Sequence, residues 1–223
     1  SQLKADKHAQ LFQKEFDLLR HLKHANIMNV HSELVYEGKR SFASEYHSGG
    51  SLESRLFGPS QLLPSVRQQL LWAQDLCRAL QYLHCRKPAV LHRDLKSANA
   101  VISADNRLVL IDFGLAVVEE GNKSQSELAG AGTLQWMSPE ALGVVRDLSA
   151  SGSTGTSSGA GEWKYSAPVA QDAADTPPMT TATDVWSFGC VLIELFAAAR
   201  PWQGLAQPKK QDIVSVLKRG QLP

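Results

Sequence analysis

Hydrophobic side chains near the start of the chain recur every three or four residues, the spacing that places them on one face of a helix. They are Leu11, Phe12, Phe16, Leu18, Leu19 and Leu22. We therefore predict an amphipathic helix from Leu3 to about Lys23. Two short runs rich in strand formers follow, Val30–Tyr36 and Arg40–Glu45, and the turn residues between them predict a β-hairpin.

A longer stretch of helical periodicity follows Ser65, whose side chain suits the first position before a helix. We predict one helix from there through His84, with an apolar stripe that packs in the core. The stripe comprises Val66, Leu70, Ala73, Leu76, Leu80 and Leu83. Before it, Ser51–Phe57 predicts a short helix, which Gly58-Pro59 ends.

The longest apolar run of the chain is Val185–Ala199. Ser187 and Glu194 interrupt this run, and it is too short to cross a bilayer. We therefore predict a buried core helix and no membrane span. Asp212–Arg219 predicts one more amphipathic helix.

The segment Arg146–Thr183 has no hydrophobic periodicity. It is rich in Gly, Ser, Thr and Ala, so it cannot bury a core of its own. We predict that residues 146–183 form a disordered insertion at the surface. Its one apolar spot, Glu162-Trp163-Lys164-Tyr165, is either a docking peptide or, as we prefer, a set of incidental apolar residues.

Composition and charge exclude several classes of protein. With 223 residues, 43% of them hydrophobic, the chain can form a globular core. A net charge of +1 provides no field that would favour nucleic acid or an anionic membrane. Cys77, Cys85 and Cys190 form no C-x-x-C pair, so we expect reduced thiols and a cytoplasmic or nuclear protein. The sequence defines no oligomeric state.

Candidate catalytic groups gather in Val90–Ala116, between the predicted helix that ends at His84 and the apolar run that begins at Val185. Two short apolar runs in it predict a β-hairpin that begins after Asp94, Lys96 and Asn99 and brings Asp112 back toward them. Two carboxylates and an amide oxygen beside an ammonium group suit a magnesium ion and a polyphosphate.

These residues resemble a known pair of motifs. His92-Arg93-Asp94-Leu95 with Asn99, followed by Asp112-Phe113-Gly114, is similar to the catalytic and metal-binding loops of eukaryotic protein kinases. The resemblance extends over nearly the whole chain outside the insertion. It implies an α+β fold of two lobes, in which residues 1–47 form a partial β-rich small lobe and the hinge, and residues 48–223 a mainly helical large lobe.

The resemblance also implies a role for each residue of this group. Asp94 would accept or orient the proton of the substrate hydroxyl, and Lys96 would neutralise charge on the transferred γ-phosphate. Asn99 and Asp112 would hold Mg²⁺ against the phosphates of ATP. Arg93 would either bind a phosphate on the activation loop, where Ser124 or Ser126 could carry it, or serve as a structural arginine.

Residues of the small lobe and hinge complete the implied nucleotide site. Glu15 stands where the family has the helix glutamate that pairs with a strand lysine. Ser44, Glu45 and His47 match the hinge, with Ser44 at the gatekeeper position, and Val101 matches the floor of the adenine pocket. No glycine-rich loop or lysine strand precedes Glu15, so we expect the chain to be a fragment of a kinase domain.

Lys96, together with Gly132-Thr133-Leu134-Gln135-Trp136-Met137, resembles the Ser/Thr kinases of the tyrosine-kinase-like, Raf-like group. The expected partners are therefore ATP and protein substrates with serine or threonine. Two alternatives remain open at this point: a pseudokinase or scaffold module without phosphoryl transfer, and an inactive truncated product. Even where the parent protein is an active kinase, we expect the 223 residues alone to be inactive or nearly so.

Overall fold

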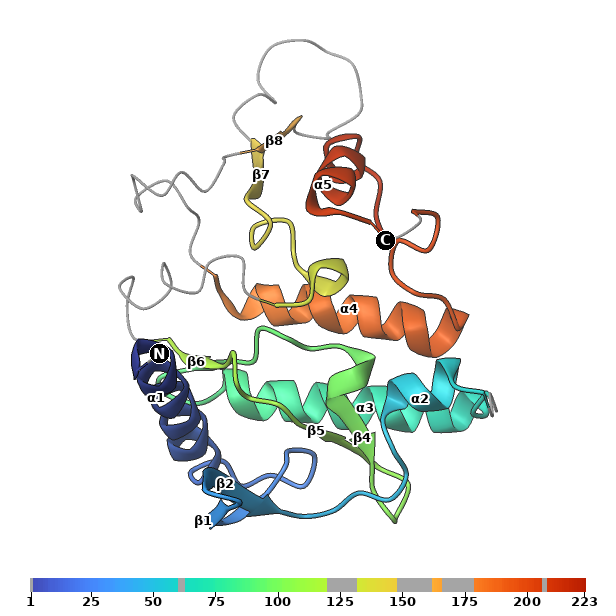
Figure 1. Cartoon of the computed structure of the whole chain (residues 1–223). Helices are drawn as coiled ribbons and strands as arrows, with labels where there is room; N and C mark the ends of the chain where they lie inside the picture. The colour runs from blue at the N-terminus through green and yellow to red at the C-terminus, as the bar shows by residue number, and fades with distance from the viewer. Residues whose placement is uncertain (1, 60–62, 120–131, 148–161, 166–178, 206–207) are drawn as a thin grey trace.

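The computed structural model describes residues 2–59, 63–119, 132–147, 162–165, 179–205 and 208–223 (Figure 1). Its helices are α1 (Gln2–Leu19), α2 (Leu52–Phe57), α3 (Val66–His84), α4 (Thr181–Ala197) and α5 (Lys210–Lys218), with 3₁₀ turns at Ser97–Asn99 and Leu134–Trp136. Its strands are β1 (Val30–Tyr36), β2 (Lys39–Ser44), β3 (Val90–Leu91), β4 (Ala100–Ile102), β5 (Leu108–Leu110), β6 (Val117–Val118), β7 (Val144–Asp147) and β8 (Glu162–Tyr165).

The strands pair as short antiparallel ladders, β1 with β2, β3 with β6, β4 with β5 and β7 with β8. The β1–β2 hairpin lies against α1, where Phe12, Phe16 and Phe42 form an aromatic cluster with ring centroids 5.8–6.4 Å apart. Both predicted hairpins of the first 116 residues are therefore confirmed.

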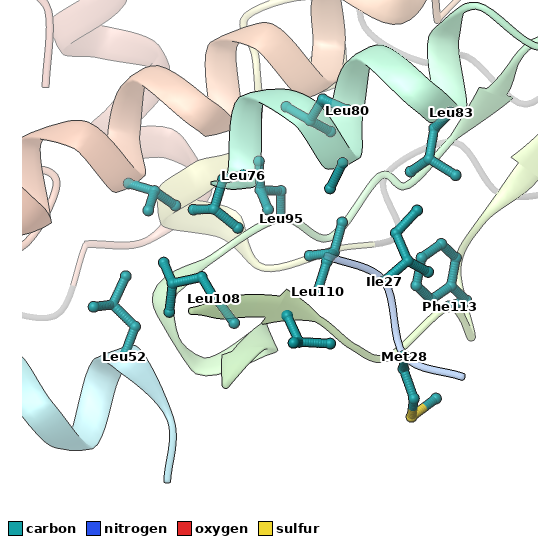
Figure 2. Close-up of a cluster of buried hydrophobic side chains, with 14 of the residues drawn as sticks. Ile27, Met28, Leu52, Leu76, Leu80, Leu83, Leu95, Leu108, Leu110 and Phe113 are labelled. Carbon is teal, nitrogen blue, oxygen red and sulfur yellow. The ribbon is translucent and has the colours of Figure 1, made fainter. Parts of the chain in front are cut away.

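The main hydrophobic core lies between α3 and the β4–β5 ladder (Figure 2). Leu76, Leu80 and Leu83 of α3 point toward Leu108 and Leu110 of β5, and all five are 5% exposed or less. Ile27 and Met28, from the loop that follows α1, join the same cluster. One core thus ties the N-terminal helix-and-hairpin part to the helical part of the chain.

Helix α4 runs alongside α3, and Gln69 of α3 donates a hydrogen bond from Nε2 to the carbonyl of Leu195 (Figure 1). Cys190, Val191 and Leu195 of α4 are buried in the core, as predicted. None of the helices in the described ranges is long and apolar enough to cross a lipid bilayer.

Three sequence predictions differ from the structure. Helix α1 ends at Leu19 rather than near Lys23, because the chain turns there so that residues 26–28 can pair with β5. The predicted stripe of α3 is wrong at its first turn, since Val66 and Leu70 are 67% and 57% exposed. The core contacts begin only one turn later, at Trp72 and Leu76.

The third difference concerns the segment 146–183, for which the sequence predicts disorder. The backbone of Glu162–Tyr165 forms β8 and pairs with β7, in register from Val144↔Tyr165 to Asp147↔Glu162. This hairpin lies beside α5 (Figure 1). The prediction is therefore wrong for residues 162–165, whose backbone groups are paired. Residues 148–161 and 166–178 lie outside the described part of the chain.

Candidate functional site

The loop that contains Asp94 is held by the carboxylate of Asp184, in the first turn of α4. Asp184 is fully buried, and its two oxygens accept the backbone N–H of His92 at 2.9 Å and of Arg93 at 2.8 Å. His84 Nε2 lies 2.8 Å from the same carboxylate. These hydrogen bonds set the direction in which Asp94 leaves the loop.

Both carboxylate oxygens of Asp94 accept hydrogen bonds. Oδ2 receives Lys96 Nζ at 2.6 Å and Asn99 Nδ2 at 3.0 Å, while Oδ1 receives the Thr133 hydroxyl at 2.7 Å and its backbone N–H at 2.9 Å. Lys96 Nζ also donates to Thr133 Oγ1 at 2.6 Å. The structure thus brings Asp94, Lys96 and Asn99 together, and it adds Thr133 to them.

His92 and Phe113 join this loop to the segment that carries Asp112. Their rings meet edge to face with centroids 4.8 Å apart. His92 Nδ1 accepts the N–H of Asp94 at 3.3 Å, and Nε2 donates to the carbonyl of Ile111 at 3.1 Å. Burial lowers the pKa of His92, which favours the neutral ring, and this ring connects the two segments through the contacts above.

The β4–β5 ladder brings Asn99 and Asp112 to the same end of the hairpin. The N–H of Ile111 donates to the carbonyl of Asn99 at 2.9 Å, and Asp112 follows in the left-handed region with a φ of 62°. Asn99 turns its amide nitrogen toward Asp94, which leaves its oxygen available. One oxygen of Asp112 accepts only the N–H of Gly114, at 3.3 Å.

Magnesium prefers hard oxygen ligands and usually retains several waters, so one or two protein oxygens suffice. Asn99 and Asp112 supply such oxygens and fit this ion. In the described part of the chain, no three His, Cys, Asp or Glu side chains gather into a metal site.

Glu15 reaches the same region from α1. A Cβ atom placed on Gly114 would lie 3.4 Å from Asp112 Oδ1 and 3.6 Å from Glu15 Oε2, so both carboxylates approach this glycine. Burial and the charge of Asp112 raise the pKa of Glu15, and a backbone hydrogen bond with Phe113 opposes them. The two carboxylates repel each other, and a cation bound near both would reduce this repulsion.

The predicted hinge residues follow β2. The N–H of Gly49 donates to the carbonyl of Ile102 at 3.1 Å, and Ile102 returns a bond to the carbonyl of Gly50 at 2.8 Å. A side chain on Gly49 would collide with Ile102, since its Cβ would lie 2.6 Å from that carbonyl oxygen. These contacts hold the segment beside half-buried Val101 of β4.

Within that segment, Ser44 is half-buried, Glu45 is exposed, and His47 has a buried Nε2 without a hydrogen-bond partner in the described residues. Asp105, in the β4–β5 turn, has a pKa lowered mainly by the hydroxyl of Ser103 and to a smaller extent by His47. A role of the backbone at Glu45 and His47 in adenine binding stays a prediction.

Two contributions to the site were not predicted from the sequence. The sequence indicates Thr133 only as a sign of substrate type, whereas in the structure its hydroxyl donates to Asp94 Oδ1. Glu194, noted only as an interruption of an apolar run, is fully buried and accepts Ser97 Oγ at 2.7 Å and Trp136 Nε1 at 2.9 Å. A carboxylate inside an apolar helix is the signal that could have identified it.

Arg93 is 5% exposed, and its role toward an activation-loop phosphate stays a prediction. Ser124 and Ser126 lie outside the described residues.

Two family models match the chain. The family described as "Protein kinase domain" matches residues 1–151, and that described as "Protein tyrosine and serine/threonine kinase" matches residues 142–223. The fold also resembles a chain of the yeast RNA Pol II CTD kinase CTDK-1 complex, with a TM-score of 0.66 and 22% identity, over 92% of this chain and 55% of that one.

Among curated proteins, the Arabidopsis thaliana serine/threonine-protein kinase CTR1 is 31% identical over 196 residues, which are 87% of this chain and 20% of CTR1. The Aspergillus fumigatus mitogen-activated protein kinase kinase kinase bck1 is 32% identical over 212 residues, 94% of this chain and 11% of bck1. The human dual specificity testis-specific protein kinase 1 is 38% identical over 136 residues, 58% of this chain and 21% of that protein. The chain thus spans about a fifth or less of each of these three relatives.

Proposed function

Because the chain belongs to the protein kinase family, we propose that the protein to which it belongs transfers the γ-phosphate of ATP to serine and threonine hydroxyls of other proteins. The observation that carries the proposal is the Asp94 cluster, in which a carboxylate, an ammonium group and a hydroxyl meet within 2.7 Å of one another. Two residues in the left-handed backbone region, Arg93 and Asp112, flank this cluster, as is common at sites of function.

In this mechanism Asp94 orients the hydroxyl of the substrate and accepts its proton. The substrate hydroxyl would replace the Thr133 hydroxyl, which donates to Asp94 Oδ1 in the structure. Lys96 lies 2.6 Å from Asp94 and 2.6 Å from Thr133, so its charge is held where the phosphoryl group would pass between nucleotide and substrate. Asn99 and Asp112 would hold Mg²⁺, which supplies positive charge to the phosphates when bound.

We assign the adenine to the segment 44–47 and to Val101. Ser44, at the end of β2, has a small side chain that would leave space behind the base, and the backbone at Glu45 and His47 would bind its edge. The backbone hydrogen bonds of Gly49 and Gly50 with Ile102 of β4 support this assignment, because they hold the segment beside Val101. In the same proposal, residues 1–47 act as the small lobe and hinge, residues 48–223 as the large lobe, and the protein works in the cytoplasm or nucleus.

Nucleotide binding can be tested on the 223-residue chain by thermal unfolding with and without Mg²⁺ and ATP. A ligand that binds only the folded state raises its stability by about 2.7 kcal/mol at a hundred times Kd. We expect a metal-dependent rise in Tm that Asp112→Asn abolishes and that the exposed control Glu119→Gln retains. A cooperatively folded sample with no such rise would contradict ATP binding at this site.

Phosphoryl transfer is tested in the full-length protein with radiolabelled ATP and a generic Ser/Thr substrate. Asp94→Asn should lower kcat by at least about a hundredfold while the ATP-dependent rise in Tm persists. Equal loss of transfer and of ATP binding would assign Asp94 to folding rather than to the reaction.

One observation favours a second candidate function, a pseudokinase or scaffold module. Within the part of the chain that the structure describes, no lysine or arginine forms an ion pair with Glu15. A protein without a cation at this position would bind partners rather than transfer phosphate. Detectable Asp94-dependent transfer by the full-length protein would exclude this alternative.

A further inference from the structure

A hollow of about 420 Å³ opens between the turn after α1 and the second half of α3. It is lined by His24, Arg78, Gln81, Tyr82, Cys85 and Arg86. None of these residues belongs to the Asp94 and Asp112 cluster. Three of the six are basic and none is acidic, so the hollow has the charge of an anion site.

The side chains of the hollow are held in place around Tyr82. The ring of His24 stacks on that of Tyr82 with centroids 5.0 Å apart. The hydroxyl of Tyr82 accepts the N–H of Lys23 at 3.0 Å and Nη1 of Arg86 at 3.1 Å, and the guanidinium of Arg86 also lies 5.6 Å from the ring centroid. His24 and Arg86 are thus fixed on the same tyrosine before any ligand arrives, which lowers the entropy cost of binding.

The backbone fixes the tautomer of His24. The N–H of Asn26 donates to His24 Nδ1 at 3.1 Å, so the proton of the neutral ring resides on Nε2, which is left as a donor. Burial, followed by the charges of Arg107 and Arg78, lowers the pKa of His24, and the charge of Asp75 opposes them. Two arginines thus act on the ring, and an anion bound beside it would reduce their repulsion of its charged form.

The nearest carboxylate does not neutralise this charge. Asp75 of α3 accepts the N–H of Leu108 at 3.0 Å and lies 3.8 Å from Nε of Arg107, so its two oxygens are directed at β5. In the described residues, Arg78 and Arg86 form no ion pair with any carboxylate. Two guanidinium groups thus face the hollow with donors to spare.

A second hollow of about 400 Å³ adjoins the first at Arg86, which lines both. Its walls include the apolar side chains of Leu18 and Val118, between α1 and β6. The same walls include Lys14, His21 and Lys87, and the single acid, Asp17, is paired with Arg20 at 3.6 Å. The anion site therefore continues into a hollow whose lining is partly apolar and partly basic.

We propose that the two hollows bind a phosphorylated segment of a protein, with the phosphate on Arg78, Arg86 and His24 Nε2 and a neighbouring apolar side chain in the second hollow. Guanidinium groups bind phosphate with paired, charge-assisted hydrogen bonds. A peptide suits the site better than a membrane surface or a nucleic acid, because the cations converge in one pocket and the chain as a whole carries a net charge of only +1.

The test is fluorescence anisotropy of a labelled peptide with one phosphoserine followed two residues later by leucine, added to the protein without ATP. Arg78→Gln and Arg86→Gln should each weaken binding about tenfold, since each removes a charged hydrogen bond. Arg67→Gln is the matched control, an exposed arginine at the other end of α3. Arg78 is exposed and forms no ion pair in the described residues, so its variant keeps the test valid even if Arg86→Gln unfolds.

Equal binding of the unphosphorylated peptide, or equal weakening by Arg67→Gln, would overturn the proposal by reducing it to general charge. Arginine-dependent binding to vesicles that contain phosphatidylserine, with none to the phosphopeptide, would overturn it in favour of a membrane surface. Because no nucleotide is present, none of these results bears on phosphoryl transfer at Asp94.

Discussion

The carboxylate of Asp184 accepts the backbone N–H of Arg93 at 2.8 Å, at a residue whose φ angle of 68° lies in the left-handed region. A left-handed backbone costs a non-glycine residue about 1 kcal/mol or more. The two hydrogen bonds from His92 and Arg93 to Asp184 offset this cost, and both are fully shielded from water. The direction of Asp94 therefore depends on a residue of a distant helix.

This relationship predicts the effect of Asp184→Asn. An amide has one acceptor oxygen and an NH₂ group, so one of the two backbone donors would face another donor in a buried site. We expect a loss of about 2–4 kcal/mol in the free energy of unfolding, measured by urea denaturation. Asp17→Asn, on the exposed face of α1, should change it by less than about 0.5 kcal/mol. Similar effects of the two variants would show that Asp184 does not hold the loop.

Glu15→Gln should stabilise the 223-residue chain at neutral pH. The pKa of Glu15 is raised in the folded state by burial and by Asp112, so folding disfavours its ionised form. The corresponding stability is fully present below the unfolded pKa, near pH 4, and is lost as pH rises through the folded pKa. We therefore expect the variant to exceed the wild type by less than about 1 kcal/mol at pH 7.5, because the side chain is half-exposed and water screens its charge.

The same pair of proteins should have equal stability below about pH 4, where Glu15 is protonated in both states. Thermal unfolding at several pH values measures the difference. Glu119→Gln, an exposed carboxylate after β6, controls for the general effect of removing a negative charge. A gain that persists unchanged at acid pH would contradict the electrostatic origin.

Thiol reactivity should separate the three cysteines. Cys77 and Cys85 are exposed, whereas Cys190 is buried in α4, and burial followed by the charge of Glu194 raises its pKa to about 12. Since the thiolate is the reactive form, iodoacetamide at pH 8 should modify the first two and leave Cys190 intact until the protein unfolds. Mass spectrometry of peptides from folded and urea-treated protein measures this. Modification of Cys190 at the rate of Cys77 in folded protein would contradict its burial.

Substitution of Thr133 tests its place on Asp94. Thr133→Val removes the hydroxyl that donates to Asp94 and accepts from Lys96, and we expect kcat in the full-length protein to fall about 10- to 100-fold. Thr133→Ser keeps the hydroxyl and should remain within about threefold of the wild type. KM for ATP should stay unchanged in both. An equal loss in both variants would assign Thr133 to packing instead.

Much of the site could be predicted from the sequence because its parts are local. Asp94, Lys96 and Asn99 lie within six residues of one another, and the β4–β5 hairpin that returns Asp112 is set by two short apolar runs. The positions of these side chains follow from chain geometry over a few residues. The same holds for the N-cap of α3 at Ser65, whose side chain accepts the backbone N–H of Gln68.

The missed features depend on residues far apart in the chain. Glu194 receives its partners from Ser97 and Trp136, and no local pattern shows that these three meet. The exposure of Val66 and Leu70 likewise depends on where the β4–β5 layer ends beneath α3, which helical periodicity does not define. Periodicity predicts a face of a helix, but tertiary packing decides how much of that face is covered.

The shared carboxylate of Glu194 has a mechanical consequence. Ser97 directly follows Lys96, and Trp136 lies three residues after Thr133, so Glu194 anchors the two segments that meet at Asp94. We therefore expect both segments to move together with α4, so that a displacement of the helix changes the 2.6 Å separation between Lys96 and Thr133 little. The helix is a common support for the two segments that face the substrate.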